Sequence, residues 1–351
     1  MSLFKLVKVK DVRKETEEAI SIAFDVDSRN EYSYQSGQYI TIKKNVNGEE
    51  IRRSYSLCSA PFENDFRVVV KKIENGRMST YLNQSIKIGD ELEIMTPAGN
   101  FVPKNFNASL IGIAAGSGIT PIFSILKSVL KAGGNFTLYY GNVNEASTIY
   151  KKEIDQLVAA HPSQLTVVYT FDEGNNANLP EINCGRIDDK KMNQFIQQNP
   201  NLLKADGFYI CGPEAMINNA NEILRYVGIA PEKIHFELFT APTKKDDNSP
   251  KFVSDFKGTS QVTVLMDGEE FEFELASNGK FILDASIEHG VDAPFSCKGA
   301  VCCTCKAKVL EGKAYMVMNY SLSQEEVKQG YILTCQSHPA SEKLVVDYDV
   351  T

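Results

Sequence analysis

The chain has 351 residues, of which 43% are hydrophobic and 23% charged, and its formal net charge is −8. This composition is typical of a soluble globular protein with two or three domains, and the length allows cores that need no disulfide bonds. The acidic balance argues against nucleic acid as a partner. The first residues lack a signal-peptide pattern, and glycines and a proline break the most apolar stretch, 110–130. We therefore expect a cytoplasmic protein that does not enter the membrane.

The first hundred residues predict an antiparallel β-barrel. Short strand-like runs lie at 20–24, 39–43, 66–71 and 91–95. Turn dipeptides separate these runs, and Asn47-Gly48 is typical of them. Short strands at this spacing favour a barrel, which we expect to cover residues 1–104.

The next region, 105–240, alternates between strands and helices. Strand-like runs lie at 109–114, 136–141, 165–170 and 207–211. Helical patterns lie at 119–132, 149–161, 188–198 and 213–227. Such alternation predicts βαβ units, and hence an α/β domain with a parallel sheet. The polar stretch that follows, 241–258, contains two prolines and is predicted to be an interdomain linker.

The last region, 259–351, predicts a small α+β domain of the β-grasp type. Runs at 260–265 and 270–275 flank Asp267-Gly268, a strong hairpin signal, and a helical pattern follows at 281–289. Five of the eight cysteines of the chain lie beyond this helix. Clustered cysteines in a chain without a signal peptide favour metal or redox chemistry over disulfides.

The cysteine spacing predicts an iron–sulfur cluster. Cys297, Cys302 and Cys305 follow the pattern C-x4-C-x2-C, and 29 residues separate Cys305 from Cys335. Two irons that share two sulfides need four thiolates, and this spacing is typical of plant-type ferredoxins. Cys303 is predicted not to be a ligand, because its use would break the x2 spacing. The alternative is a structural zinc site, but zinc ribbons use two C-x2-C pairs and this region has one.

The text around these cysteines resembles the plant-type [2Fe–2S] ferredoxin family from about residue 260 to residue 351. The resemblance rests on the spacing and on the flanking sequences DASIEHG, at 284–290, and PFSC, at 294–297. It implies a cluster bound by Cys297, Cys302, Cys305 and Cys335.

Two short motifs in the barrel region suit a flavin. The first is Arg53-Ser54-Tyr55-Ser56, and the second places Gly76, Met78 and Ser79 ahead of a short helix. An arginine can neutralise a diphosphate, a tyrosine can lie on an isoalloxazine ring, and a serine can donate to a ring nitrogen. A glycine before a helix exposes N–H groups to phosphate. Taken alone, the first motif favours a solvated arginine and a core tyrosine over a flavin site.

Two further motifs suit a dinucleotide, because each follows a buried strand and opens a helix. The first contains Gly116, Ser117, Gly118, Thr120 and Pro121, and the second contains Cys211, Gly212, Pro213 and Met216. Glycines allow a tight turn and a close approach of pyrophosphate to a helix N-terminus. Both strand ends should meet at one edge of the sheet, where ligands bind in open α/β folds.

Together these motifs resemble the ferredoxin-NADP reductase superfamily. The resemblance implies that Arg53 meets the diphosphate of FAD, that Tyr55 stacks on the flavin and that Ser56 lies near its N5 atom. Ser79 and the helix amides beside it would hold phosphate. This chain has Asn75 where many relatives place another glycine.

The same resemblance places Cys211 beside C4 of the nicotinamide. It also implies that Phe239 covers the flavin face and that Glu237 belongs to a proton or charge network nearby. The alternative for Cys211 and Phe239 is ordinary core packing. The choice between NADH and NADPH stays open, because Val143 stands where many NADPH-using relatives carry an arginine. Possible substitutes for that arginine are Lys151, Lys152 and Arg186.

The order of the three domains predicts an electron-transfer enzyme that uses NAD(P)H, FAD and a [2Fe–2S] cluster. Flavin can take electrons in pairs and pass them on singly, which connects a hydride donor to a one-electron cluster. The order resembles the reductase components of bacterial multicomponent oxygenases, above all the reductase subunits of phenylacetyl-CoA epoxygenase complexes. This resemblance implies a partner oxygenase and a role in phenylacetate catabolism. The chain carries no pair of E-x-x-H motifs for a diiron site of its own.

Other functions stay open at this point. The acceptor could be a hybrid-cluster protein or a desaturase, since the domain order does not distinguish them. A carrier that only stores electrons is disfavoured by the nicotinamide motifs. The last alternative is an interaction protein that is stapled by zinc and has no enzymatic activity.

Overall fold

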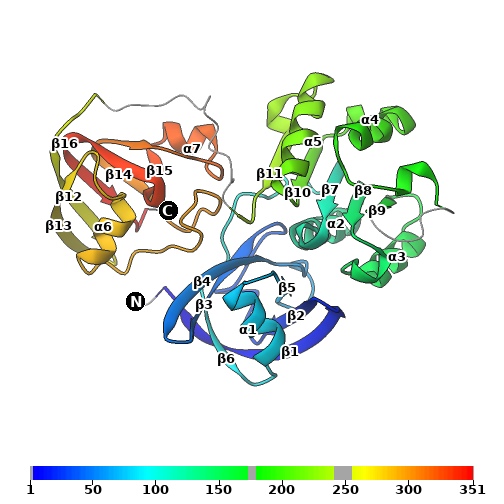
Figure 1. The fold of residues 1–351 in the computed structure, drawn as a ribbon, viewed down its shortest axis with the longest axis horizontal. Helices are drawn as coiled ribbons and strands as arrows, with labels where there is room; N and C mark the ends of the chain where they lie inside the picture. The colour runs from blue at the N-terminus through cyan, green and yellow to red at the C-terminus, as the bar shows by residue number, and fades with distance from the viewer. Residues whose placement is uncertain (1–2, 173–178, 241–254, 351) are drawn as a thin grey trace.

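The computed structural model describes residues 3–172, 179–240 and 255–350. Three sheets form three separate bodies: an N-terminal barrel, an α/β domain and a C-terminal α+β domain (Figure 1). The multidomain fold expected from the sequence is confirmed. The predicted linker at 241–258 lies, up to residue 254, outside the described residues. Within the described ranges, none of the helices has both the length and the apolar character needed to cross a membrane.

The barrel is a six-stranded antiparallel sheet with the strand order β4-β3-β6-β1-β2-β5. A bridge between Leu57 and Val68, just beyond β4, joins the two outer strands and closes the sheet. Its interior is apolar and includes Ile22, Ile40 and Leu92. The elements are β1 (Lys5–Thr16), β2 (Ala19–Phe24), β3 (Tyr39–Val46), β4 (Glu49–Ser56), β5 (Arg67–Lys71), α1 (Arg77–Ser85) and β6 (Glu91–Ile94).

Turn chemistry explains the strand pairing that carries the flavin motif. Strands β3 and β4 are joined by Asn47 and Gly48, whose φ angles are 55° and 85°. Two left-handed residues in succession make the turn whose twist matches a β-hairpin. The hairpin register sets Tyr39 opposite Ser56. The short helix α1 packs on β3 and β5, so its N-terminus lies near the end of β4.

The α/β domain has a parallel five-stranded sheet with the order β11-β10-β7-β8-β9. Alternate residues of β7 face opposite cores, since Leu110 belongs to one apolar cluster and Ile111 to the other. Helices therefore cover both faces. The strands are β7 (Ser109–Ala115), β8 (Asn135–Asn142), β9 (Leu165–Phe171), β10 (Gly207–Cys211) and β11 (Ile234–Glu237). The helices are α2 (Ile119–Ala132), α3 (Lys151–Ala160), α4 (Asp189–Gln198) and α5 (Glu214–Tyr226).

The C-terminal domain combines five strands with two short helices, in the order β13-β12-β16-β14-β15. Asp267 and Gly268 form the predicted hairpin turn between β12 and β13, and β12 runs parallel to β16. Helix α6 packs on β13 and β16. The elements are β12 (Thr259–Met266), β13 (Glu269–Ala276), α6 (Ile282–Glu288), β14 (Lys306–Met316), α7 (Gln324–Lys328), β15 (Tyr331–Leu333) and β16 (Ser337–Asp347).

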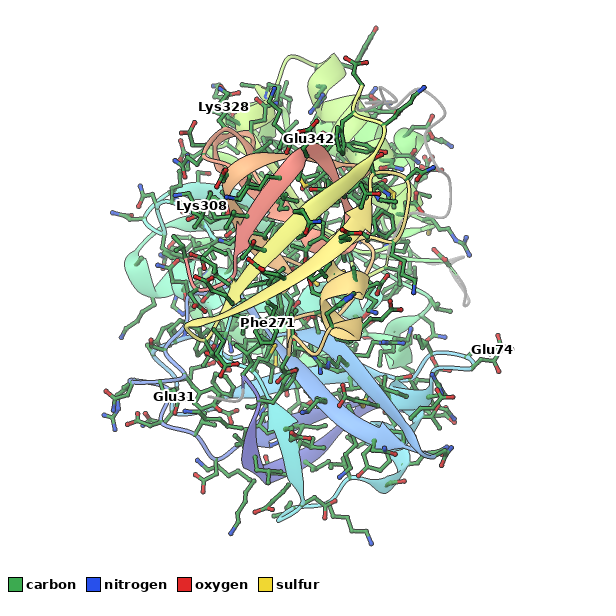
Figure 2. All side chains as sticks on the ribbon, turned by 90° about the vertical axis from the view of Figure 1, so that its left-hand side faces the viewer. Glu31, Glu74, Phe271, Lys308, Lys328 and Glu342 are labelled. Carbon is green, nitrogen blue, oxygen red and sulfur yellow. The ribbon has the colours of Figure 1, made fainter. Side chains whose placement is uncertain are left out.

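The three bodies meet at one junction. Seen from the side, the C-terminal sheet stands above the barrel and in front of the α/β domain (Figure 2). Hydrogen bonds join the C-terminal domain to the barrel, for example between Ser54 and Ser296. The Ser56 hydroxyl at the end of β4 donates to Glu237, which ends β11. The ends of β4 and β11 therefore lie at the contact of all three domains.

Candidate electron-transfer site

A cavity of about 910 Å³ lies between the barrel and the α/β domain. Its walls come from the end of β4, the start of α1 and the loops that follow β7 and β10. The volume is in the range of cavities that bind cofactors. The structure brings fourteen of the residues predicted from sequence to this cavity: Arg53, Tyr55, Ser56, Gly76, Met78, Ser79, Gly116, Ser117, Gly118, Thr120, Gly212, Pro213, Met216 and Phe239.

The start of α1 forms one end of the cavity. The helix begins at Arg77, so Met78 and Ser79 lie in its first turn and not ahead of it as the sequence suggested. A Cβ on Gly76 would lie 2.4 Å from both Ile73 Cγ1 and Ser79 Oγ, so any larger residue would displace these two side chains. The Ser79 hydroxyl donates to the Gly76 carbonyl at 3.1 Å and holds this turn closed. The helix start therefore faces the cavity without a side-chain cap, as a phosphate site requires.

Arg53 and Tyr55 line the same cavity from β4. The Arg53 side chain is exposed, and its Nη1 donates to the Arg52 carbonyl at 2.7 Å. Tyr55 packs against the barrel core, and burial raises the pKa of its phenol well above the usual value. The Arg53 guanidinium suits an anionic group of a ligand, and the neutral Tyr55 ring suits a flat aromatic system.

The other wall of the cavity is formed by two loops in close contact. A Cβ on Gly118 would lie 2.0 Å from the Cys211 carbonyl oxygen, so the two loops touch backbone to backbone. Gly116 has a φ of +53°, a conformation that favours glycine, and its carbonyl accepts from Tyr140 at 3.1 Å. The Thr120 hydroxyl donates to Ser117 O at 3.0 Å. These loops follow β7 and β10, where the strand order of the sheet reverses, which is the usual ligand position of such folds.

Cys211 and Pro121 do not line this cavity. Both are buried: Cys211 ends β10, and Pro121 lies in the first turn of α2. Burial, and next the charge of nearby Glu237, raise the pKa of the Cys211 thiol well above its ordinary value. The thiol is therefore neutral and lies directly behind the glycine loops.

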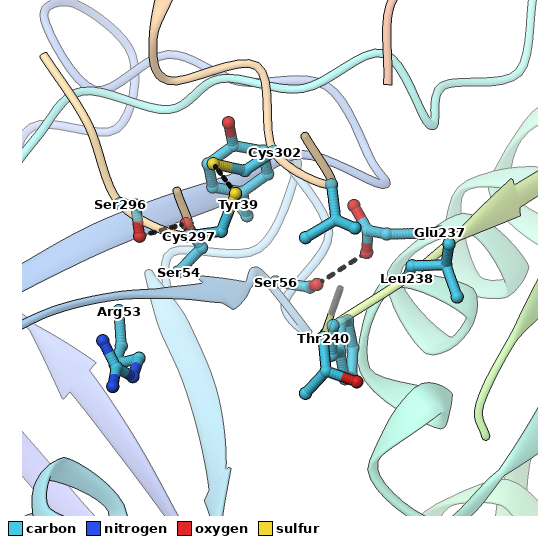
Figure 3. Close-up of a pocket in the computed structure, with 12 residues that line it drawn as sticks. Tyr39, Arg53, Ser54, Ser56, Glu237, Leu238, Thr240, Ser296, Cys297 and Cys302 are labelled. Atoms are coloured by element: carbon cyan, nitrogen blue, oxygen red, sulfur yellow. Dashed lines mark hydrogen bonds between the residues drawn. The ribbon is translucent and has the colours of Figure 1, made fainter. Parts of the chain in front are cut away.

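A second cavity, of about 270 Å³, lies where the three domains meet (Figure 3). The barrel contributes Tyr39 and Ser56, β11 contributes Glu237, and the cysteine loop, residues 297–305, contributes Cys297 and Cys302. The Ser56 hydroxyl donates to Glu237 Oε2 at 2.9 Å. Burial raises the pKa of Glu237 to about 7, and the Ser56 hydrogen bond partly opposes this shift. A carboxyl that titrates near neutral pH can hold or release a proton here.

Phe239 connects the two cavities, since its side chain lines both. It is 41% exposed, which is unusual for a phenylalanine at a domain junction. The alternative of ordinary core packing does not fit this exposure. The exposed ring is available to cover a flat ligand in the larger cavity.

The four predicted cluster ligands form two pairs. The sulfur atoms of Cys297 and Cys302 are 3.1 Å apart, and the thiols of Cys305 and Cys335 are also in contact. In the part of the chain that the structure describes, no three side chains of the metal-binding types gather round one point. Two pairs of thiols suit two irons with two protein ligands each, whereas a structural zinc takes four ligands at one ion.

The backbone of the cysteine loop turns toward the sulfurs. The Gly299 N–H donates to Cys297 Sγ at 3.3 Å. The left-handed residues of the loop are Lys298 and Ala300, with φ angles of 50° and 61°, rather than Gly299. The contact with Cys302, helped by backbone N–H groups, lowers the pKa of Cys297 to about 6. Such donors stabilise thiolate sulfur and tune the potential of a bound cluster.

Cys303 points away from these two pairs. Its sulfur lies 3.4 Å from the Ser321 carbonyl, and burial raises its pKa to about 11. Its backbone N–H donates to the Tyr39 hydroxyl at 3.0 Å. The peptide of Cys303 therefore serves a contact between domains.

Sequence reasoning missed the contacts that join the cysteine loop to the barrel. Phe295 and Ser296 belong to the PFSC flank that the sequence singled out, but their partners in the barrel, Arg52 and Ser54, and the contact of Tyr39 were not predicted. Ser54 lies inside the predicted flavin motif, but no local pattern marked its side chain. The partners of these contacts lie more than 200 residues apart along the chain, so no spacing signal connects them.

Of the three cationic side chains that could help to choose between NADH and NADPH, only Arg186 lies at the large cavity. Arg186 lines the large cavity and pairs with Asp172 at 2.7 Å, and Val143 also lines it. Lys151 pairs with Asp155 at 2.6 Å, and neither Lys151 nor Lys152 belongs to the cavity wall.

Comparisons with known proteins agree with these three sites. Residues 4–102 match the oxidoreductase FAD-binding domain, 113–222 the oxidoreductase NAD-binding domain, and 264–340 the 2Fe-2S iron-sulfur cluster binding domain. The chain is 36% identical to one of the subunits of 1,2-phenylacetyl-CoA epoxidase from Escherichia coli, over 99% of both chains. It is 32% identical to the ferredoxin reductase component of 3-ketosteroid-9-alpha-monooxygenase from Rhodococcus rhodochrous, over 98% of this chain and 96% of that protein.

Solved structures support the same assignment. Phthalate dioxygenase reductase, described as a modular structure for electron transfer from pyridine nucleotides to [2Fe-2S], is 25% identical, with a TM-score of 0.59 and 98% coverage of both chains. An intact type IV self-sufficient cytochrome P450 monooxygenase shares the fold, with a TM-score of 0.72 and 20% identity, over 98% of this chain and 41% of that one. The chain thus belongs to the family of oxygenase reductase components that join FAD-binding, NAD-binding and [2Fe–2S] domains in one polypeptide.

Proposed function

We propose that this protein takes electrons from NAD(P)H and delivers them singly, through FAD and a [2Fe–2S] cluster, to a partner oxygenase. The observation that carries the proposal is the second cavity, called here the junction cavity, which joins the flavin strand (β4, with Arg53 and Ser56), β11 and the cysteine loop. One small space thus borders the candidate flavin site and two candidate cluster ligands. FAD bound in the large cavity would supply the conversion between two-electron hydride transfer from NAD(P)H and single-electron transfer to a cluster held by the four cysteines.

We assign the residues to roles on this basis. Arg53 and the start of α1, with Gly76, Met78 and Ser79, bind the phosphates of FAD, and Tyr55 stacks on its ring. Gly116, Gly118 and the loop after β10 bind the dinucleotide. Ser56, Glu237 and Phe239 line the place of hydride transfer, and the buried Cys211 lies behind the loops that form its wall. Cys297, Cys302, Cys305 and Cys335 bind the cluster.

The Ser56–Glu237 pair is the candidate proton site of this arrangement. With a pKa of about 7, the Glu237 carboxyl exchanges a proton near neutral pH, and its partner Ser56 can relay that proton toward the large cavity. A group whose pKa matches the working pH is suited to acid–base work.

The domain limits that go with this assignment are 1–104 for FAD, 105–240 for NAD(P)H, 241–258 for the linker and 259–351 for the cluster. We infer a cytoplasmic location, because thiols that are to bind a cluster stay reduced there. The nucleotide can be NADH or NADPH, because Arg186 lines the cavity but is held by Asp172.

The proposed acceptor is an oxygenase of the phenylacetyl-CoA epoxidase type. What supports it is the 36% identity to the Escherichia coli epoxidase protein along 99% of both chains. Another acceptor, such as a hybrid-cluster protein or a desaturase, is the alternative.

The test has two steps. The purified protein should show flavin and iron–sulfur absorption, and NAD(P)H should bleach the flavin band and produce the EPR signal of a reduced [2Fe–2S] cluster. A colourless protein that contains zinc would contradict the proposal. The protein is then combined with the oxygenase subunits of a phenylacetyl-CoA epoxidase, and NAD(P)H oxidation that depends on phenylacetyl-CoA is expected. Cluster reduction without any turnover of that oxygenase would point to another acceptor.

A further inference from the structure

The cysteine loop and the two residues before it, Phe295 and Ser296, are fastened to the barrel by a small set of side chains. Ser54 Oγ donates to Ser296 Oγ at 2.9 Å. The Arg52 guanidinium lies 4.1 Å from the centre of the Phe295 ring. Asn100 Nδ2 lies 3.8 Å from Cys303 Sγ. Tyr39 contacts both residues that follow the candidate ligand Cys302.

The backbone of Tyr39 is part of the barrel, next to the strand that carries the flavin motif. Tyr39 is the first residue of β3 and pairs across the hairpin with Ser56, the residue that bonds Glu237. Its N–H and C=O groups also exchange hydrogen bonds of 2.9 Å with Ala98. These pairings, with Ser56 on one side and Ala98 on the other, fix Tyr39 in the barrel wall.

The ring of Tyr39 is held as firmly as its backbone. The side chain is buried, with 5% exposure, and lines the junction cavity. A Cβ on Gly99 would lie 2.9 Å from two carbons of this ring, so the glycine leaves room for it. Ring and backbone together form an arm that runs from β3 of the barrel to the cysteine loop (Figure 3).

The hydroxyl of Tyr39 makes two hydrogen bonds at the end of this arm. It accepts from the Cys303 N–H at 3.0 Å and lies 3.1 Å from the Thr304 hydroxyl, which is also buried. The Cys303 N–H belongs to the peptide that follows Cys302. The Tyr39 side chain therefore links the start of β3, which pairs with Ser56, to the backbone next to the candidate ligand Cys302.

From this geometry we propose that Tyr39 is a positioning residue, whose hydroxyl holds the cysteine loop at the distance from the flavin strand that fast internal electron transfer requires. The inference rests on the proposed function, since it assumes FAD in the large cavity and a cluster on the four cysteines. Electron transfer slows steeply as donor and acceptor separate, and reactive groups need supporting contacts that prevent such drift.

The variant Tyr39→Phe tests the inference, because it keeps the ring and removes both hydrogen bonds. The Cys303 N–H then lacks its partner in the domain interface, which favours separation of the loop from the barrel. We expect cluster reduction about tenfold slower, equal to about 1.4 kcal/mol of docking free energy.

The experiment uses the full chain loaded with both cofactors. NAD(P)H is mixed in under anaerobic conditions, and flavin bleaching and the cluster EPR signal are followed separately. In Tyr39→Phe the flavin should bleach at the wild-type rate, and the midpoint potential of the cluster should be unchanged. The matched control is Tyr34→Phe, which removes a buried hydroxyl that donates to Ser59 Oγ at 3.0 Å inside the barrel. It should leave both rates unchanged.

The outcomes separate this inference from the proposed function. If the wild-type flavin is not bleached, or no reduced-cluster signal forms, the proposed function fails. If the wild type gives both signals and Tyr39→Phe reduces its cluster at the wild-type rate, the role of Tyr39 is refuted. A slower rate that comes with a lower cluster potential also refutes it, since Tyr39 would then tune the potential and not the distance.

Discussion

The contact between the two nucleotide loops leads to a sharp prediction for Gly118→Ala. The new Cβ would lie 2.0 Å from the Cys211 carbonyl oxygen and 2.7 Å from the Gly212 nitrogen. Ordinary contact begins at 3.4 Å, so the loops must separate by roughly 1.4 Å. Because backbone atoms cannot rotate away as a flexible side chain does, the whole loop has to move.

Overpacking of this kind costs about 1–3 kcal/mol of folding stability. The functional effect should be larger, since a shift of 1 Å at a reacting centre can cost roughly 100-fold in rate. We expect hydride transfer from NAD(P)H to the flavin to fall by about that factor. The rate is measured by stopped-flow bleaching of the flavin at saturating NAD(P)H.

Gly228→Ala is the matched control for this prediction. Gly228 has a φ of +90° with open space around it, so alanine there strains the backbone without a clash and far from the cavity. The strain costs about 1–2 kcal/mol, comparable to the stability loss at Gly118. Hydride transfer should be unchanged in this control. A Gly118→Ala protein that bleaches its flavin at the wild-type rate would refute the proposed contact of the two loops with the nucleotide.

Three further substitutions test other parts of the site. Cys335→Ser removes one thiol of the second cysteine pair, so the rate of cytochrome c reduction should fall by more than about 100-fold. Ferricyanide reduction should continue, because the flavin serves it directly. Equal loss of both activities would contradict separate flavin and cluster sites. Cys303→Ser should keep wild-type iron and sulfide content, and loss of iron would make Cys303 a ligand. In Glu237→Gln the inflection near pH 7 in the rate of flavin reduction should disappear. Since burial raises the Glu237 pKa from 4.5 to about 7, wild-type stability should be full below pH 4.5 and decline as the pH rises through 7, and melting curves of Glu237→Gln should lack this decline.

Local patterns in the sequence were sufficient for most of the secondary structure. The apolar periodicity of 119–132 matches α2 residue for residue, and Asn47-Gly48 and Asp267-Gly268 form the expected turns. The predicted helix at 149–161 begins later, at Lys151, because Tyr150 adopts a left-handed φ of 59°. These features depend on neighbours in the chain, which is why short windows reveal them.

Strand β1 shows where local reasoning failed. Lys5–Thr16 carries charged residues at many positions and buries few of its side chains, so it has little apolar signal. It forms because its first half pairs with β6 and its second half with β2. Pairing on both edges, with the neighbouring β2 and with the distant β6, makes it a strand, rather than the apolar character of its own residues.

The amino-acid sequence by itself determined which cofactor motifs are present and in what order. Cysteine spacing and glycine-rich turns are patterns of residues close together in the chain, so they can be recognised before the fold is known. Only the tertiary structure decided that Ser56 meets Glu237, 181 residues away, and that Tyr39 meets Thr304, 265 residues away. Such contacts arise where separately folded domains dock, and docking depends on the shapes of whole surfaces that no local pattern encodes.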